Sequence, residues 1–314
     1  MLQPGLPAAE SEASLRHVEE PNRQRADRAL TPLLVLGAGR SGTTLLMQLL
    51  GSSPQILFDR VYPFEVRYFT YLLRWALVLH QEWQPGNSWG PAEIFTPPDG
   101  RIGPFPYVGA PLWEHQQLWT RCFTAAWGEF SRSAGIRAHR DGPTLTPPLY
   151  YAEKIPFWVP AYVRQVIPYK IILLVRDPRD IFLSITAFDR KRGFPGFTRR
   201  PEDDDWTFAV RFVALCRERF KVQREETGSP GSILVKYERL AIDPEGEAQR
   251  LSQWLGVTLD VGGVDNHVPY LARHMTSESP RESVERWRRE LSAKLNRFFV
   301  QELREELQHF GYET

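Results

Sequence analysis

The sequence has few cysteines and no marked surplus of charge of either sign. Of its 314 residues only Cys122 and Cys216 are cysteines, and both lie in apolar stretches expected to be helical. This pattern favours buried thiols over a disulfide framework or a cysteine metal site. The formal net charge is +1, which gives no reason to expect nucleic acid or an acidic membrane surface as a partner.

The sequence also lacks long hydrophobic runs. Residues 1–30 are polar and contain no apolar core of a secretory signal. No run approaches the roughly 18 apolar residues of a membrane span, and Arg74 interrupts the apolar patch 68–80. We therefore expect a cytoplasmic protein without a membrane span, in which residues 1–30 form a flexible tail.

Hydrophobic residues make up 42% of the chain and aromatic residues 12%, enough for a sizeable core. Short apolar runs predict strands at 33–36, 56–59, 171–175 and 232–236. Helices are expected at 43–51, 64–80, 113–131, 180–188, 205–225, 245–255 and 283–309. This alternation is typical of a parallel sheet covered by helices on both faces. We predict one α/β domain over residues 31–314, without a mid-chain linker.

Residues 33–46, LLVLGAGRSGTTLL, carry the most informative motif. An apolar strand runs into a glycine turn and then a helix, whose N-terminal N–H groups and dipole favour an anion. Gly37, Gly39 and Gly42 fit a dinucleotide fingerprint, with Asp59 as its ribose-binding acid. Gly37 and Gly42 also fit half of a P-loop. A glycine turn without any ligand is a third interpretation.

Arg40 favours the P-loop interpretation, because a dinucleotide pyrophosphate is held mainly by backbone and needs no cation in the turn. Thr43 stands where an ATPase or kinase has the lysine that reaches the β- and γ-phosphates, which argues against those classes.

A second motif occupies residues 171–184, IILLVRDPRDIFLS. It places Arg176 at the carboxyl end of a strand, where open α/β sheets bind ligands, and Ser184 in the helix that Pro178 begins. The alternative is a salt-bridged turn in which the charges of this motif only pair with one another.

Together the two motifs resemble the sulfotransferases that use 3′-phosphoadenosine 5′-phosphosulfate (PAPS). VKYERL at 235–240 and SESPRESVERWRREL at 277–291 are similar to two further family segments, in the same order. The resemblance implies a P-loop-type fold over 31–314. It also implies a 5′-phosphosulfate loop of Gly39, Arg40, Ser41, Gly42, Thr43 and Thr44, and 3′-phosphate contacts from Arg176, Ser184, Tyr237 and Arg281. Arg40 is closer to the protein-tyrosine and carbohydrate branches, because the cytosolic phenol branch has lysine there.

The implied reaction is transfer of a sulfuryl group from PAPS to a hydroxyl or amine, with release of 3′-phosphoadenosine 5′-phosphate (PAP). We expect in-line attack without a metal, because the sulfonate carries one negative charge that side chains can stabilise. The expected acceptor is a small molecule, sugar or lipid-like hydroxyl compound. Two carboxylates are candidate bases. Glu65 follows the loop helix and is expected among aromatic residues that would raise its pKa. Glu153 precedes Lys154, which would approach the sulfonate.

Two loops and two other functions remain open. The proline- and glycine-rich insert 85–111 forms either part of the acceptor site or a structural loop. Residues 189–205 form either a lid over the nucleotide or a solvated charged face. The alternative functions are an NAD(P)-dependent oxidoreductase, which would leave the second motif unexplained, and a nucleotide-binding protein without activity.

Overall fold

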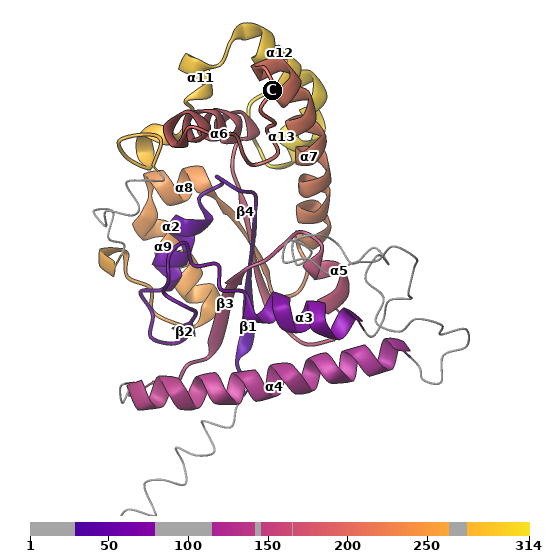
Figure 1. Cartoon of the computed structure of the whole chain (residues 1–314). Helices are drawn as coiled ribbons and strands as arrows, with labels where there is room; N and C mark the ends of the chain where they lie inside the picture. Colours follow the sequence, from indigo (N-terminus) through magenta and orange to yellow (C-terminus); the bar gives the residue numbers. More distant parts are fainter. Residues whose placement is uncertain (1–28, 79–114, 142–145, 165, 264–274) are drawn as a thin grey trace, which may run out of the picture.

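Figure 1 shows the computed structural model of the chain, which describes residues 29–78, 115–141, 146–164, 166–263 and 275–314. Residues 1–28 of the predicted tail and the insert 85–111 lie outside the described residues, so both remain predictions. Leu30, at the end of the predicted tail, is buried. Its carbonyl oxygen accepts a hydrogen bond from Trp127 Nε1 at 3.2 Å.

Five parallel strands form the central sheet in the order β2-β3-β1-β4-β5. The strands are β1 (Thr31–Gly37), β2 (Ile56–Leu57), β3 (Tyr150–Lys154), β4 (Lys170–Val175) and β5 (Ser232–Lys236). The register places Val35 of β1 beside Lys154 on one side and Ile172 on the other. The predicted fold class, a parallel sheet flanked by helices, is confirmed. The apolar runs had not indicated β3.

Alternating residues of β1 and β4 face opposite sides of the sheet, as the period of a strand requires. Leu33 and Val35 pack under one helical layer, and Leu34 and Leu36 under the other. The first layer contains α2 (Thr43–Leu50), α8 (Tyr237–Ile242) and α9 (Pro244–Leu255). The second contains α3 (Tyr68–Val78), α4 (His115–Asp141) and α5 (Val159–Val163). The sheet is thus buried on both faces (Figure 1).

A third apolar cluster lies beyond the carboxyl end of β4, around Phe182, Phe212 and Phe299. It joins α6 (Pro178–Arg192), α7 (Asp205–Glu226), α12 (Ala293–Glu302) and α13 (Arg304–His309). The end of the chain is anchored on this side: Tyr312 Oη donates to Glu238 Oε2 at 3.2 Å, and Arg179 Nη2 donates to the carbonyl oxygen of Glu313 at 2.9 Å.

Three helix predictions need correction. The helix expected at 283–309 is interrupted: η3 (Arg281–Ser283) and α11 (Trp287–Glu290) precede α12 and α13. The helix expected from residue 64 begins at Tyr68, and that expected to end at 131 continues to Asp141. A short turn, η2 (Val261–Gly263), follows α9.

Both cysteines are free thiols. Cys216 is buried, as predicted, and Cys122 is partly exposed. Burial raises the pKa of the Cys216 thiol to about 12, so this side chain behaves as an inert core residue.

Candidate active site

The glycine turn between β1 and α2 leaves the N-terminus of α2 open. Gly42 precedes the helix with φ 96°, and no side chain caps the first turn. A Cβ at Gly42 would lie 2.2 Å from the ring of Tyr237, which begins α8 after β5. Both the left-handed backbone and this close approach require glycine. The free N–H groups and dipole of α2 therefore face the space above the sheet.

Arg40 connects this turn to α6. Its Nε donates to Ser184 Oγ at 3.2 Å, and its guanidinium lies 4.5 Å from the centroid of the Phe188 ring. Burial, and secondly the neighbouring Arg176, lowers the pKa of Arg40 to about 10. The side chain is therefore still cationic at neutral pH.

Arg176 follows β4 and lies beneath the same space. Its Nη1 donates to the carbonyl oxygen of Arg40 at 2.9 Å and its Nη2 to that of Ser283 at 2.7 Å. The guanidinium stacks on Tyr237 at 4.2 Å. Within the described residues its Nε is buried and has no hydrogen-bond partner. A buried donor without an acceptor is costly and rare, so it indicates a place for an anionic ligand.

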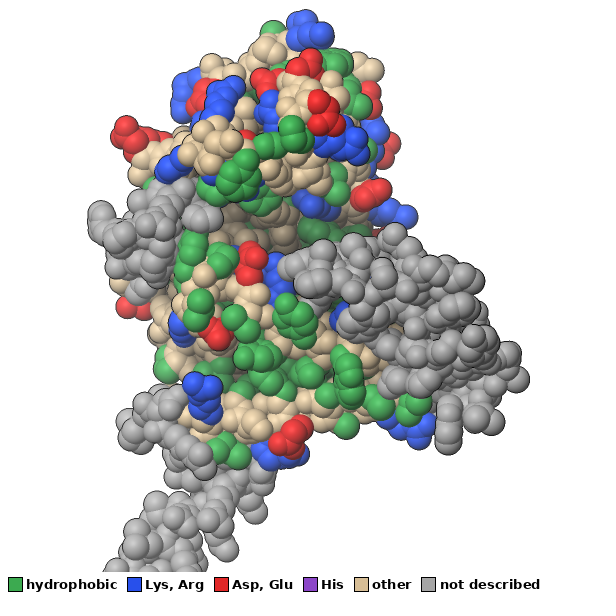
Figure 2. All heavy atoms as spheres, in the orientation of Figure 1, with side chains coloured by type: hydrophobic (Ala, Val, Ile, Leu, Met, Phe, Trp, Pro, Cys, Tyr) green, Lys and Arg blue, Asp and Glu red, His purple; other side chains and the backbone are tan. Residues whose placement is uncertain are grey.

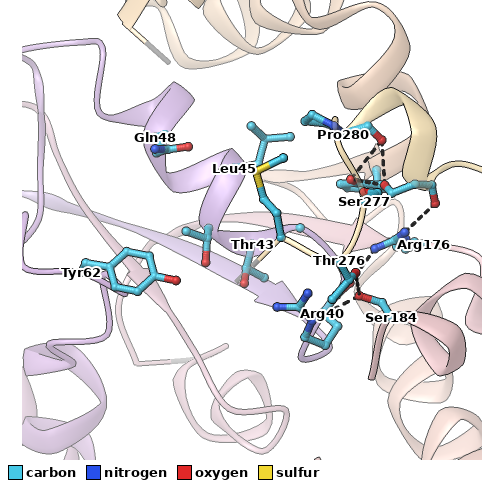
Figure 3. A pocket seen from close by; sticks show the side chains of 15 residues that line it. Arg40, Thr43, Leu45, Gln48, Tyr62, Arg176, Ser184, Thr276, Ser277 and Pro280 are labelled. Carbon is cyan, nitrogen blue, oxygen red and sulfur yellow. Dashed lines mark hydrogen bonds between the residues drawn. The ribbon is translucent and has the colours of Figure 1, made fainter. Parts of the chain in front are cut away.

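These residues line one pocket, shown in Figure 3. Arg40 and Arg176 follow the carboxyl ends of β1 and β4, which are neighbours in the sheet. After β1 the chain continues to the strands at one edge of the sheet, and after β4 it continues to the strand at the other edge. Ligands of open α/β sheets bind at such a switch point. On the face drawn in Figure 2 the surface is hollowed between the helices at the top of the view and the sheet below. The lining residues are Arg40, Gly42, Thr43, Thr44, Leu45, Gln48, Tyr62, Arg176, Ser184, Tyr237, Met275, Thr276, Ser277, Pro280 and Ser283.

Three predicted donor contacts do not line this pocket. Gly39 lies behind Arg40, against Phe197. Ser41 is buried, and its hydroxyl donates to the carbonyl oxygen of Ala38 at 2.7 Å, which stabilises the turn. Arg281 points away, with its Nη2 donating to the carbonyl oxygen of Ile242 at 3.0 Å.

Several lining residues were not predicted. Tyr62 and Gln48 lie on the far side of the pocket from Arg176, and the Tyr62 hydroxyl points toward Thr43 (Figure 3). Ser283 Oγ lies 2.6 Å from Tyr237 Oη. In the sequence, the one indication that Ser283 lines the site was its position in the segment around Trp287.

Residues of the RDPRD motif lie in two places: Arg176 faces the pocket, and Arg179 lies in the core. Arg179 is buried, pairs with Asp177 at 2.7 Å and stacks on Trp287 at 3.6 Å. Asp180 accepts the backbone N–H groups of Glu285 and Trp287 at 2.7 and 2.9 Å. The salt-bridged turn considered from the sequence therefore describes Arg179, whereas Arg176 faces the pocket.

Lys154, at the end of β3, extends the site. Its Nζ donates to Thr44 Oγ1 at 3.0 Å and to the carbonyl oxygen of Pro63 at 2.7 Å, and lies 3.6 Å from Glu65 Oε1. Burial lowers the pKa of Lys154 to about 8, and Glu65 partly opposes the shift. A buried cation thus lies between the phosphate loop and the carboxylate of Glu65.

The apolar environment predicted for Glu65 is wrong. Its side chain is 42% exposed and pairs with Arg67 at 3.3 Å as well as with Lys154. The carboxylate lies between two cations instead of among aromatic rings.

Glu153 faces the opposite side of the sheet from Lys154, because adjacent residues of a strand alternate. Its oxygens accept the N–H groups of Phe69 and Thr70 at 2.7 and 2.9 Å and the Thr70 hydroxyl at 2.5 Å. The side chain is 1% exposed, and burial raises its pKa to about 7. Glu153 therefore caps the start of α3 and does not reach the pocket.

The strand order also disfavours the dinucleotide interpretation. A ribose-binding acid must follow a strand beside β1, whereas β3 separates β2 from β1. Asp59 instead accepts the N–H of Val61 at 2.9 Å in a surface turn.

No cluster of three or more His, Cys, Asp or Glu side chains suited to a metal occurs among the residues that the structure describes. In the same parts of the chain, no helix combines the length and apolarity needed to cross a membrane.

Residues 167–311 match the family described as sulfotransferase domain. This part of the chain is a sulfotransferase domain. The family and the enzyme class indicated by the motifs are thereby confirmed, and the match includes Arg176, Ser184 and Tyr237. The phosphate loop lies before the matched residues. No curated protein sequence matches the chain.

The fold agrees with this assignment. The sulfotransferase domain of the Synechococcus PCC 7002 olefin synthase is 18% identical, with a TM-score of 0.51 over 91% of this chain and 97% of that domain. A sulfotransferase from Alicyclobacillus acidocaldarius (16% identical, TM-score 0.45, 91% and 98% covered) and a mouse sulfotransferase complexed with PAP (12%, 0.49, 88% and 85%) are more distant. We base the fold comparison on the first.

Proposed function

We propose that this sulfotransferase domain transfers a sulfuryl group from PAPS to a hydroxyl or amine of a small acceptor and releases PAP. The observation that carries the proposal is the convergence of Arg40 and Arg176 on the open N-terminus of α2, in one pocket. One buried and one half-buried guanidinium, together with a helix N-terminus, suit a ligand with several anionic groups.

The donor is held by both motifs in this proposal. The N–H groups and hydroxyls of Thr43 and Thr44 bind the 5′-phosphate, and Arg40 lies at the sulfonate and bridging oxygens. Arg176 and Ser184 bind the 3′-phosphate, which supplies an acceptor for the unpartnered Nε of Arg176. Tyr237 supports that guanidinium from below. Arg40 stabilises the negative charge that develops on the leaving oxygen.

Glu65 is the proposed base on the acceptor side, with Lys154 as a second cation for the sulfonate. Glu65 is the exposed partner of this pair, so an acceptor can reach its carboxylate, while Lys154 contacts Thr44 beside the proposed 5′-phosphate site. The carboxylate takes the proton of the attacking hydroxyl as the oxygen–sulfur bond forms. Glu153 is excluded from this role in the proposal, because its oxygens are enclosed by the start of α3.

The acceptor class proposed from the sequence is a small molecule, sugar or lipid-like hydroxyl compound. Screening hydroxyl and amine libraries with labelled PAPS tests it. A cytoplasmic location, residues 1–30 as a tail and the insert 85–111 as an acceptor loop also remain predictions.

Thermal-shift and calorimetric titrations with PAP, ADP and NAD test the donor site. PAP at a hundredfold excess over its Kd should add about 3 kcal/mol of stability, and NAD should add none. Arg176→Ala should weaken PAP binding by about 2–4 kcal/mol, because a shielded charge-assisted pair is lost. ADP, which lacks the 3′-phosphate, should bind almost as before.

Arg281→Ala is the matched control, since this arginine lies near the pocket but points away from it. Equal losses for PAP and ADP in Arg176→Ala would contradict the 3′-phosphate assignment. PAP binding without turnover of any acceptor in the library would favour a nucleotide-binding protein without activity.

A further inference from the structure

An aromatic ring of the segment between α6 and α7 touches the phosphate loop. A Cβ placed on Gly39 would lie 2.7 Å from a ring carbon of Phe197. The ring therefore covers the backbone one residue before Arg40. Neither of the two sequence motifs contains Phe197, and it is not among the residues that line the donor pocket.

Phe197 also supports the aromatic residue beneath Arg40. The Phe188 and Phe197 rings have centroids 6.0 Å apart, and Phe188 is the ring under the Arg40 guanidinium. Arg192 lies over both rings, 5.0 and 5.4 Å from their centroids. Phe197 thus contacts the Arg40 region twice, through the backbone of Gly39 and through Phe188.

The backbone at Phe197 is strained, and side chains of α7 hold the segment that carries it. Phe197 and Thr198 have φ of 51° and 80°, values uncommon for a bulky and a β-branched residue. Arg211 Nη1 donates to the carbonyl oxygen of Thr198 at 3.3 Å, and Arg199 pairs with Asp205 at 2.9 Å. Strained residues persist where their surroundings over-determine them, and they cluster at functional sites. These contacts favour a fixed support over the lid considered from the sequence.

We propose that Phe197 is a positioning residue that holds Arg40 in the geometry needed for sulfuryl transfer. The inference rests on the proposed function, because it assigns Arg40 to the charge that develops on the leaving oxygen. The ring restricts the Gly39–Arg40 backbone and fixes Phe188, so that the Arg40 side chain stays beside Ser184. In this proposal, Arg176 and the N-terminus of α2 bind the nucleotide without the help of Phe197.

The test compares Phe197→Ala with Phe194→Ala. Phe194 is the matched control, because Arg192 also stacks on its ring, at 4.4 Å, but it is 59% exposed and does not touch Gly39. Phe197→Ala should lower kcat by about 10²-fold, as a misplacement of roughly 1 Å can do. The Kd for PAP should change by less than about fivefold, because a group that acts mainly in the transition state affects kcat more than binding.

Phe197→Tyr provides the rescue. Phe197 is 39% exposed, so a hydroxyl can reach solvent while the ring keeps its contacts, and kcat should return to near the wild-type value. Phe194→Ala should retain wild-type kcat. Melting temperatures of all three variants show whether each one folds.

Three results would overturn the inference while leaving the proposed function intact: equal kcat in Phe197→Ala and Phe194→Ala, parallel losses of kcat and PAP affinity, or no recovery in Phe197→Tyr. A wild-type protein that neither binds PAP nor consumes PAPS would overturn the proposed function, and this inference with it.

Discussion

Lys154 should give the enzyme an alkaline limit of activity near pH 8. Burial lowers the pKa of its ammonium from 10.5 to about 8. A shift of this size corresponds to about 3 kcal/mol against the charged form. Since a lysine loses its charge as pH rises through its pKa, the free enzyme should keep this cation below pH 8 and lose it above.

The expected pH profile follows from this loss of the Lys154 charge above pH 8. The kcat/KM for PAPS should be level on the acid side of pH 8, half-maximal near pH 8 and then fall about tenfold per unit, because kcat/KM reports groups of the free enzyme. Bound PAPS is anionic and should favour the ammonium, so the limb of kcat should lie at higher pH than that of kcat/KM.

Lys154→Arg and Lys154→Met separate this group from others. The guanidinium of an arginine stays charged, so Lys154→Arg should lose the limb at pH 8. The Lys154→Met variant should turn over slowly at every pH, and its kcat/KM should show no fall centred near pH 8. Initial rates with labelled PAPS from pH 6.5 to 10 measure all three profiles. An unchanged midpoint in Lys154→Arg would refute the reasoning.

Substitutions at four other residues test the site. Arg40→Ala should lower kcat by about 10²–10³ with a smaller change in KM for PAPS, and Arg40→Lys should retain much of the activity in the same steady-state assay. Glu65→Gln should abolish turnover while calorimetry shows unchanged PAP affinity; near-normal kcat at saturating acceptor would exclude Glu65 as the base. Glu153→Gln should keep turnover but lose about 1–3 kcal/mol in denaturant unfolding, because a buried N–H at the start of α3 loses its acceptor. Asp180→Asn should weaken PAP binding about fivefold in calorimetry by loosening the segment that carries Ser283.

The sequence was most informative where burial is uniform. β1 and β4 are covered on both faces, so each reads as a continuous apolar run that predicts a strand. The two motifs follow β1 and β4, and Arg40 Nε donates to Ser184 Oγ, so the motifs lie together at the carboxyl edge of the sheet.

β3 could not be recognised in the same way, because it reads Tyr-Tyr-Ala-Glu-Lys and its two charged residues are buried. Their partners, the first N–H groups of α3 and the hydroxyl of Thr44, come from distant parts of the chain. Without this strand, the sequence could not show that Glu153 and Lys154 face opposite sides. The sequence could therefore not show that Glu153 lies away from the pocket, and Glu65 as the base stays a proposal.

The sequence contained a local signal for the interruption of the helix expected at 283–309. The spacing of apolar residues had instead predicted one continuous helix. Ser292 caps α12 by accepting the N–H of Leu295 at 3.3 Å, and a serine before an apolar run is a common helix start. The turn that carries Ser283 is held instead by Asp180, across more than a hundred residues of sequence. Such a long-range contact leaves no local pattern.

The anchored end of the chain has a practical consequence for anyone who produces this protein. Glu313 contacts Arg179, which lies only three residues beyond Arg176 in the motif that binds the 3′-phosphate in our proposal. Trimming of the last four residues would therefore remove a support of the nucleotide site. Weak PAP binding by such a preparation would reflect the loss of these residues.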